Sequence, residues 1–291
     1  MTTRVWMEAA RPKTLLAGVC PVWMGSALAY REGGFHAASA LAALLGAMAI
    51  QVGTNYCNDY FDAIQGADTQ DRQGPRRAVQ AGLVTPKAMF RATLLAFGLA
   101  ACLSGYLVFR AGWPLALVGL VSILCGFGYT ASRFSLAYLG LGDLFVLVFF
   151  GPVAVAGTYY VQTLRSPWIA ALAGLGPGFL SVGILVVNNL RDIQQDARAE
   201  KRTLAVRLGA NFARAEYLAC VLLAAGVPCV LNLACDWKAI ILLASLATLP
   251  GLAIARQLCR TDGAALNPYL GRTAAVLLLY TLVFAWVCPW A

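Results

Sequence analysis

Long apolar segments separated by polar ones run along almost the whole chain. Apolar stretches of about 17–25 residues are long enough to span a bilayer as helices. No segment shows the alternation with a period of two that is typical of a strand. Since only helices or closed barrels satisfy their backbone hydrogen bonds within lipid, the pattern predicts an all-α, polytopic membrane protein. The nine expected transmembrane helices are residues 14–30, 37–57, 92–109, 113–130, 137–160, 168–187, 217–234, 239–255 and 273–290.

Composition agrees with this fold class. Of the 291 residues, 60% are hydrophobic and 12% are charged, whereas a soluble domain carries about 25% charged residues. With nine spans, 18 of the 22 Lys and Arg residues fall on the side of the N-terminus. The positive-inside rule then places the N-terminus in the cytoplasm and the C-terminus outside. Because membrane topology explains the net charge of +9, we expect contact with membrane lipid and no nucleic-acid partner.

The nine cysteines include no CxxC pair, and His36 is the single histidine. A disulfide framework, a zinc site and histidine-based catalysis are therefore not expected.

Two polar segments, roughly 58–91 and 188–214, are predicted to be long cytoplasmic loops. Each opens with an Asn that precedes an Asp by four residues: Asn58 and Asp62 in the first, Asn188 and Asp192 in the second. Further acids and then basic residues follow in both. The recurrence after four spans predicts a quasi-repeat of two four-helix halves with the ninth helix appended, within a single membrane domain over residues 1–291.

The residue types in these clusters indicate a particular chemistry. Residues four apart share a helix face, so facing helix ends could gather several carboxylates that would repel one another in a low dielectric. Mg²⁺ would neutralise them, because it takes a few carboxylates and fills its other positions with phosphate oxygens and water. The trailing Arg and Lys residues would bind the same phosphates. The alternative is a set of solvated charges that cap membrane helices; the repeat of the pattern favours a magnesium–pyrophosphate site.

Four stretches resemble the UbiA superfamily of intramembrane aromatic prenyltransferases, and the similarity covers nearly the whole chain. They are RPKTLLAGVCPVWMG (11–25), NDYFDAIQGADTQDRQGPRRAVQAGLVTP (58–86), YTASRFSLAYLGLGDLFVLVFFG (129–151) and NNLRDIQQDARAEKRTLAVRLG (188–209). Within the superfamily, the chain is most similar to the branch that prenylates 1,4-dihydroxy-2-naphthoate in menaquinone biosynthesis. The resemblance implies nine helices around a central cavity, a bacterial inner-membrane location, and Mg²⁺-dependent transfer of a polyprenyl group from polyprenyl diphosphate with loss of CO2 and pyrophosphate.

The resemblance also implies roles for individual residues. Metal ligands would be Asn58, Asp59, Asp62, Asp68, Asp192 and Asp196. Diphosphate would be bound by Arg11, Lys13, Arg72, Arg77 and Lys201. The aromatic acceptor would be bound by Tyr129, Arg133, Tyr138, Asn188 and Asn189. Asp62, Asp192 and Asp143 are the candidate catalytic residues.

Asp143 lies a short way into the fifth predicted span. Carboxylates inside a membrane are costly and usually face a cavity, so we expect it to deprotonate or orient the acceptor hydroxyl. The alternative is a simple interhelical hydrogen bond.

Other functions remain open from the residues alone. The acceptor could be 4-hydroxybenzoate, homogentisate, a porphyrin or chlorophyllide. A secondary transporter would carry its ionisable residues near the bilayer midplane, whereas here they gather at one face. A scaffold protein would give no reason for two matched acidic clusters.

Overall fold

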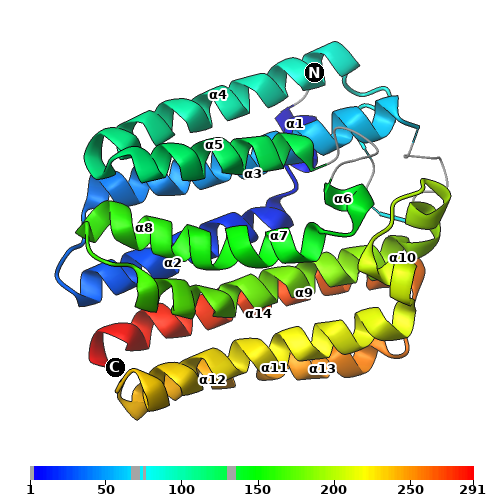
Figure 1. The fold of residues 1–291 in the computed structure, drawn as a ribbon. Coiled ribbons are helices and arrows are strands. Elements are labelled where there is room, and N and C mark those ends of the chain that lie inside the picture. The colour runs from blue at the N-terminus through cyan, green and yellow to red at the C-terminus, as the bar shows by residue number, and fades with distance from the viewer. Residues whose placement is uncertain (1–2, 67–72, 75–76, 130–135) are drawn as a thin grey trace.

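The computed structural model describes residues 3–66, 73–74, 77–129 and 136–291, and all regular secondary structure in these ranges is helical. In Figure 1 the long helices run side by side along one direction, and the short helices α6 and α10 lie at the same end of the bundle. The all-α prediction is therefore confirmed for the described residues. The α-helices are α1 (Thr3–Ala9), α2 (Pro12–Arg31), α3 (Ala37–Ile64), α4 (Pro86–Ala111), α5 (Trp113–Gly128), α6 (Leu136–Leu139), α7 (Gly142–Val148), α8 (Ala154–Thr163), α9 (Trp168–Arg198), α10 (Leu204–Leu208), α11 (Ala210–Ala234), α12 (Leu243–Leu246), α13 (Leu249–Leu258) and α14 (Asn267–Val287).

Shorter helical turns complete several of these elements. A π-helical turn over Phe149–Val153 joins α7 to α8. Turns of 3₁₀ helix over Ala239–Leu242 and Gly263–Leu266 precede α12 and α14, and a third, over Cys288–Trp290, follows α14.

Seven helical stretches in the described part of the chain are long and apolar enough to cross a membrane, so the protein is a multi-pass membrane protein. They are Ala37–Ile64, Pro86–Ala111, Gly142–Thr163, Trp168–Arg198, Ala210–Ala234, Ala239–Leu258 and Gly263–Trp290. Each coincides with a predicted span. The two other predicted spans fall on α2, which is not among the seven, and on α5, which has 16 residues. The count of nine stays a prediction.

The two polar segments begin later than predicted. Helix α3 continues to Ile64 and α9 to Arg198, so Asn58–Asp62 and Asn188–Asp196 are helical and do not belong to the loops. In α3 the carboxylates of Asp59 and Asp62 bond to groups of later segments, and in α9 Asn188 and Asp192 bond to Arg191 of the same helix. After α3 the chain turns at Gly66, whose φ of +68° is a left-handed conformation that glycine adopts readily.

Close packing of α9 against the π-helical turn fixes α7 in place. A Cβ atom added to Gly174 would lie 2.8 Å from the carbonyl carbon and oxygen of Gly151. One added to Gly178 would lie 2.8 Å from the carbonyl oxygen of Leu147. Only glycine permits such backbone approach. Pro152 and the non-helical Gly151 (φ −119°, ψ −109°) bend the segment here, and α7 is held against α9 as a result.

At the end of the bundle opposite the acidic motifs, α4 is bonded to α8. Arg110 of α4 donates to the backbone carbonyls of Val161, at 2.9 Å, and Gln162, at 3.2 Å. Beside this contact, Ala111, Leu115 and Val161 form a buried apolar cluster. A cation at the carboxyl end of α8 also complements the helix dipole.

Candidate active site

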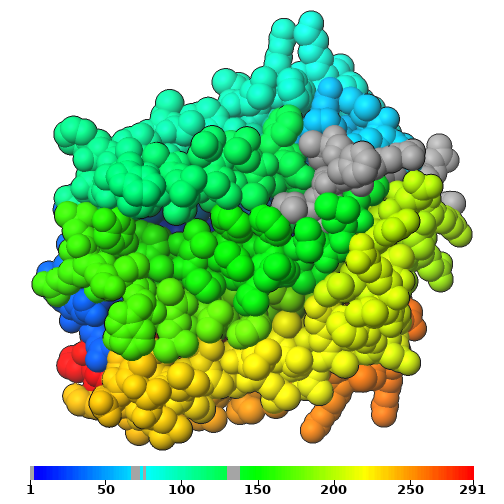
Figure 2. All heavy atoms as spheres, viewed as in Figure 1, coloured from blue at the N-terminus to red at the C-terminus, as the bar shows by residue number. Residues whose placement is uncertain are grey.

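A cavity of about 380 Å³ lies among the helices. Its lining on α3 runs from Asp62 to Ala43, and at about 1.5 Å per residue this interval covers roughly 28 Å, close to the thickness of a hydrocarbon core. Charged and amide side chains line the end near Asp62, while apolar and small residues line most of the remainder. Figure 2 shows the surface of one face hollowed between α5 and α8, with atoms of the N-terminal helices visible through the hollow.

The two acidic motifs meet at the polar end of this cavity. Asp62 of α3 accepts a hydrogen bond from Nζ of Lys201 at 2.9 Å, and Lys201 follows α9 in the second polar segment. Its other oxygen accepts from Nη2 of Arg77 at 2.9 Å. All three side chains are largely buried, at 3%, 14% and 8% exposure for Asp62, Lys201 and Arg77. Segments 139 residues apart are thus joined directly.

Lys201 is held on two sides. Its ammonium lies 5.6 Å from the ring centroid of Tyr138, within the range of a cation–π interaction. Burial lowers the pKa of Lys201, but the nearby carboxylates of Asp62 and Asp196 outweigh burial and raise the pKa above its ordinary value. The side chain therefore carries its positive charge at neutral pH.

Arg191 was missed as a site residue from the sequence, although it lies within the second motif. Its side chain, 1% exposed, donates to both oxygens of Asp192 at 2.7 and 2.5 Å and to the amide oxygen of Asn188 at 2.7 Å. It also donates to Asn267 at 3.0 Å, and Asn267 in turn donates to the backbone oxygen of Gln73. The only indication in the sequence is that Arg191 directly precedes Asp192. This adjacency does not predict that the two side chains bond to each other.

The oxygen atoms at the polar end of the cavity are compatible with Mg²⁺. Asn58, Asp62, Asp192 and Asp196 all line the cavity and present oxygen atoms, which are the ligands that Mg²⁺ prefers. Among the described residues there is no group of three or more His, Cys, Asp or Glu side chains that could hold a metal alone. Mg²⁺ commonly binds through one or two carboxylates together with substrate phosphates. The site thus suits an ion shared with a phosphorylated ligand.

Two of the predicted carboxylates have cationic partners in the structure. Asp62 is paired with Arg77 and Lys201, and Asp192 is paired with Arg191. Protein cations therefore compensate part of the negative charge of the two motifs.

The structure places the remaining predicted residues unequally. Arg11, Tyr129, Asp143, Asn188 and Asn189 line the cavity, whereas Lys13, Asp59 and Tyr138 do not. Both carboxylate oxygens of Asp59 face the loop backbone, accepting from the N–H groups of Ala78 and Val79 at 3.0 Å each. Asp68, Arg72 and Arg133 lie outside the described residues.

Asp143 and Tyr129 lie next to each other in the cavity wall. A Cβ atom on Gly142 would lie 2.8 Å from the Tyr129 hydroxyl oxygen, which places that hydroxyl against the residue before Asp143. Asp143 is 8% exposed, and its Oδ1 has no hydrogen-bond partner in the described part of the chain. An open acceptor in a buried setting is costly unless a ligand or water occupies it.

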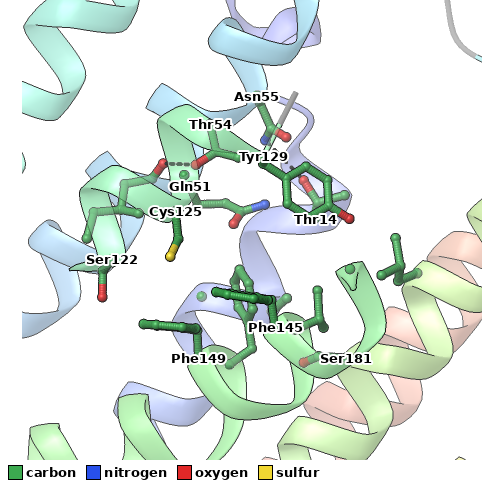
Figure 3. A pocket seen from close by; sticks show the side chains of 18 of the residues that line it. Thr14, Gln51, Thr54, Asn55, Ser122, Cys125, Tyr129, Phe145, Phe149 and Ser181 are labelled. Atoms are coloured by element: carbon green, nitrogen blue, oxygen red, sulfur yellow. Dashed lines mark hydrogen bonds between the residues drawn. The ribbon is translucent and has the colours of Figure 1, made fainter. Parts of the chain in front are cut away.

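Farther into the cavity, polar and aromatic side chains face one another (Figure 3). Gln51, Thr54, Ser122 and Cys125 lie on one side of the space, and the stacked rings of Phe145 and Phe149 lie across from them. The ring centroids of Phe145 and Phe149 are 5.6 Å apart with planes 5° from parallel. No sequence pattern selects this group, since each residue is ordinary within an apolar span.

These features define a class of protein: a multi-pass helical membrane protein whose cavity presents cations and oxygen ligands at one end and a largely apolar lining along the rest. The UbiA prenyltransferase family matches residues 18–267. The chain belongs to that family and is a prenyltransferase.

Two curated relatives are similar to the chain over almost their whole length. The chain is 40% identical over 285 residues to the 1,4-dihydroxy-2-naphthoate octaprenyltransferase of Mycobacterium tuberculosis (strain ATCC 25618 / H37Rv), covering 96% of this chain and 95% of that protein. It is 38% identical over 294 residues to the Escherichia coli (strain K12) enzyme of the same name, covering 97% and 94%.

Solved structures share the fold. A UbiA homologue from Archaeoglobus fulgidus bound to GPP and Mg²⁺ has a TM-score of 0.65 at 16% identity, covering 96% of this chain and 99% of that chain. The same homologue bound to DMAPP and Mg²⁺ has a TM-score of 0.64 at 13% identity, covering 96% and 98%. At these identities the comparison establishes the arrangement of helices.

Proposed function

We propose that the protein transfers a polyprenyl group from polyprenyl diphosphate to 1,4-dihydroxy-2-naphthoate and so produces demethylmenaquinol for menaquinone biosynthesis. The observation that carries the proposal is the direct contact between Lys201 and Asp62, which brings both motifs to the polar end of one long cavity. The names of the relatives at 35–40% identity support this acceptor over other aromatic acceptors.

The polar end would bind the diphosphate. Arg77 and Lys201 are already directed into the cavity, and they would exchange part of their contact with Asp62 for diphosphate oxygens. Arg11 lines the same end. Oxygens of Asn58, Asp62, Asp192 and Asp196 would hold Mg²⁺. When bound, Mg²⁺ acts as a Lewis acid that stabilises the charge developing on the departing pyrophosphate.

The acceptor would lie below the diphosphate, close to Asp143 and Tyr129. Asp143 offers an oxygen that has no hydrogen-bond partner among the described residues and can accept a hydrogen bond from a ring hydroxyl, which would increase the electron density of the ring. The allylic C–O bond of the donor breaks, and the ring carbon that bears the carboxylate forms the new C–C bond. CO2 then leaves, and the electrons of its bond return to the ring.

The aromatic wall of Phe145 and Phe149 would protect the reacting carbon. Their stacked rings present π faces that stabilise positive charge, and the apolar lining excludes water that would otherwise capture an allylic cation. The prenyl tail would occupy the apolar remainder of the cavity, which on α3 continues down to Ala43.

We also propose the finer topology. The chain crosses a bacterial inner membrane nine times as a single domain over residues 1–291, with its N-terminus in the cytoplasm, its C-terminus outside and two quasi-repeated halves of four helices. The asymmetric distribution of Lys and Arg supports this orientation. In this orientation the polar end of the cavity would lie at the cytoplasmic face.

The test is an acceptor comparison with the purified protein in detergent. A radiolabelled polyprenyl diphosphate is supplied with Mg²⁺ and one acceptor at a time: 1,4-dihydroxy-2-naphthoate, 4-hydroxybenzoate or homogentisate. We expect label in a quinol product, with release of CO2, for the naphthoate alone. Preferential labelling of another acceptor would reject the naphthoate assignment, and absence of any product would reject the proposed transfer.

A further inference from the structure

Asp59 lies one residue after the predicted metal ligand Asn58 but has different surroundings. It is 2% exposed and is not among the described residues that line the cavity. Oδ2 accepts from the backbone N–H of Ala78 and Oδ1 from that of Val79, each at 3.0 Å. The carboxylate thus faces the polypeptide that returns toward α4.

The segment that Asp59 contacts is a compact helical turn. Ala81 N–H donates to the carbonyl of Arg77 at 3.0 Å, and Leu83 N–H donates to that of Ala78 at 3.0 Å. The first N–H groups of such a turn have no partner within it, and Asp59 accepts two of them from 19 and 20 residues away. It therefore acts as an N-terminal cap supplied by another helix.

Arg77 is the residue immediately before the two capped N–H groups. Its guanidinium reaches Asp62 at 2.9 Å, so two acids of α3, three residues apart, hold the same short segment. Asp59 fixes its backbone and Asp62 receives its side chain. Arg77 lines the cavity, while the adjoining Ala78 packs into a small buried cluster with Ala9, Val84 and Met89.

We propose that Asp59 is a positioning residue, which holds the backbone after Arg77 so that the guanidinium points into the cavity, and that it is not a metal ligand. Each Asp59 oxygen is engaged by a backbone N–H, and the buried carboxylate does not line the cavity into which Asn58 and Asp62 present their oxygens. The kinetic part of the inference rests on the proposed function, because it takes Arg77 to bind the donor diphosphate. The structural part does not.

The test compares Asp59→Asn with Asp62→Asn in the full-length protein. Asparagine keeps the shape of Asp59 but turns an N–H₂ group toward one of the two backbone donors. We expect faster hydrogen–deuterium exchange in peptides that contain Ala78 and Val79. We also expect the KM for polyprenyl diphosphate to rise about tenfold, the equivalent of about 1.4 kcal/mol, with a smaller change in kcat. Mn²⁺ affinity in the presence of inorganic pyrophosphate, measured by electron paramagnetic resonance, should be unchanged in Asp59→Asn and weakened in Asp62→Asn.

A double-mutant cycle tests whether Asp59 acts through Arg77. In an Arg77→Met background the Asp59→Asn change should raise KM no further, because the side chain that it positions is gone. Additive effects on KM would overturn the proposal, as would a loss of Mn²⁺ affinity in Asp59→Asn equal to that in Asp62→Asn.

Two features keep the result decisive. If Asp59→Asn fails to insert, Asp59→Ser provides a second variant, because serine has no carboxylate but its hydroxyl can still accept an N–H. Unchanged Mn²⁺ affinity together with faster exchange at Ala78 would support the positioning role. Lost Mn²⁺ affinity would overturn it. If the wild-type protein does not prenylate the naphthoate, the proposed function fails by itself, while exchange and Mn²⁺ binding still decide the role of Asp59.

Discussion

Replacing Asp62 by asparagine distinguishes two descriptions of the site in the absence of metal. If the acidic motifs formed a cluster of mutually repelling carboxylates, removing one charge would stabilise the metal-free protein. In the structure Asp62 is instead the shared counter-ion of Arg77 and Lys201, so its removal leaves two buried cations poorly compensated. The sign of the stability change therefore decides between the two.

The magnitude follows from burial. The side chains of Arg77 and Lys201 are 8% and 14% exposed, so they retain little contact with water. Removing one partner of a buried ion pair costs about 3–5 kcal/mol. For a chain of this size, 1 kcal/mol corresponds to about 2 °C in Tm, so we expect Asp62→Asn to lower Tm by roughly 6–10 °C.

The assay is thermal unfolding in detergent with EDTA, followed by intrinsic tryptophan fluorescence. Adding Lys201→Met to Asp62→Asn removes one of the two cations and should recover part of the lost Tm, while prenyl transfer stays absent in both variants. A Tm equal to or above that of the wild type for Asp62→Asn in EDTA would refute the reasoning. So would strict additivity of the two substitutions.

Three further outcomes are expected. Arg191→Lys keeps the positive charge but loses the paired hydrogen bonds of the guanidinium to Asp192, so kcat/KM for the donor should fall about 10- to 100-fold. Steady-state kinetics at saturating acceptor measure this change, and a wild-type kcat/KM would contradict the prediction. Gly174→Ala forces a Cβ atom against backbone and should lower Tm by roughly 2–6 °C, whereas the matched Gly98→Ala, with nothing within 4 Å, should not. Gly157 lines the apolar end with open space beside it, so Gly157→Leu should raise KM more for long prenyl donors than for a ten-carbon donor; equal effects would place the tail elsewhere.

The sequence predicted the features that membrane physics imposes on any such chain. Apolar segments of spanning length must be helical, and the cations that flank them indicate orientation. The helices and the polar end of the cavity could therefore be predicted from the sequence. The recurrence of Asn58–Asp62 as Asn188–Asp192 predicted that the motifs belong together, and the contact of Lys201 with Asp62 agrees with it.

Individual partners could not be predicted in the same way. Asp59 bonds to backbone groups 19 and 20 residues later, and Arg191 to Asn267, 76 residues later. Such pairings depend on how helices pack and on where a loop returns, which neither hydrophobic periodicity nor residue type records. The helix ends were misplaced for a related reason, since a polar residue can continue a helix beyond the bilayer when neighbouring elements bond to its side chain.

The contact of Arg110 with the end of α8 has an electrical consequence. A hollow that runs for most of the bilayer thickness would become a water-filled conductor if both of its ends were open. The buried apolar cluster at that end disfavours a continuous file of water. The positive charge of Arg110 beside it repels protons and metal cations. If the proposed prenyl tail occupies the interior of the bundle, this end would limit ion leakage along the same path.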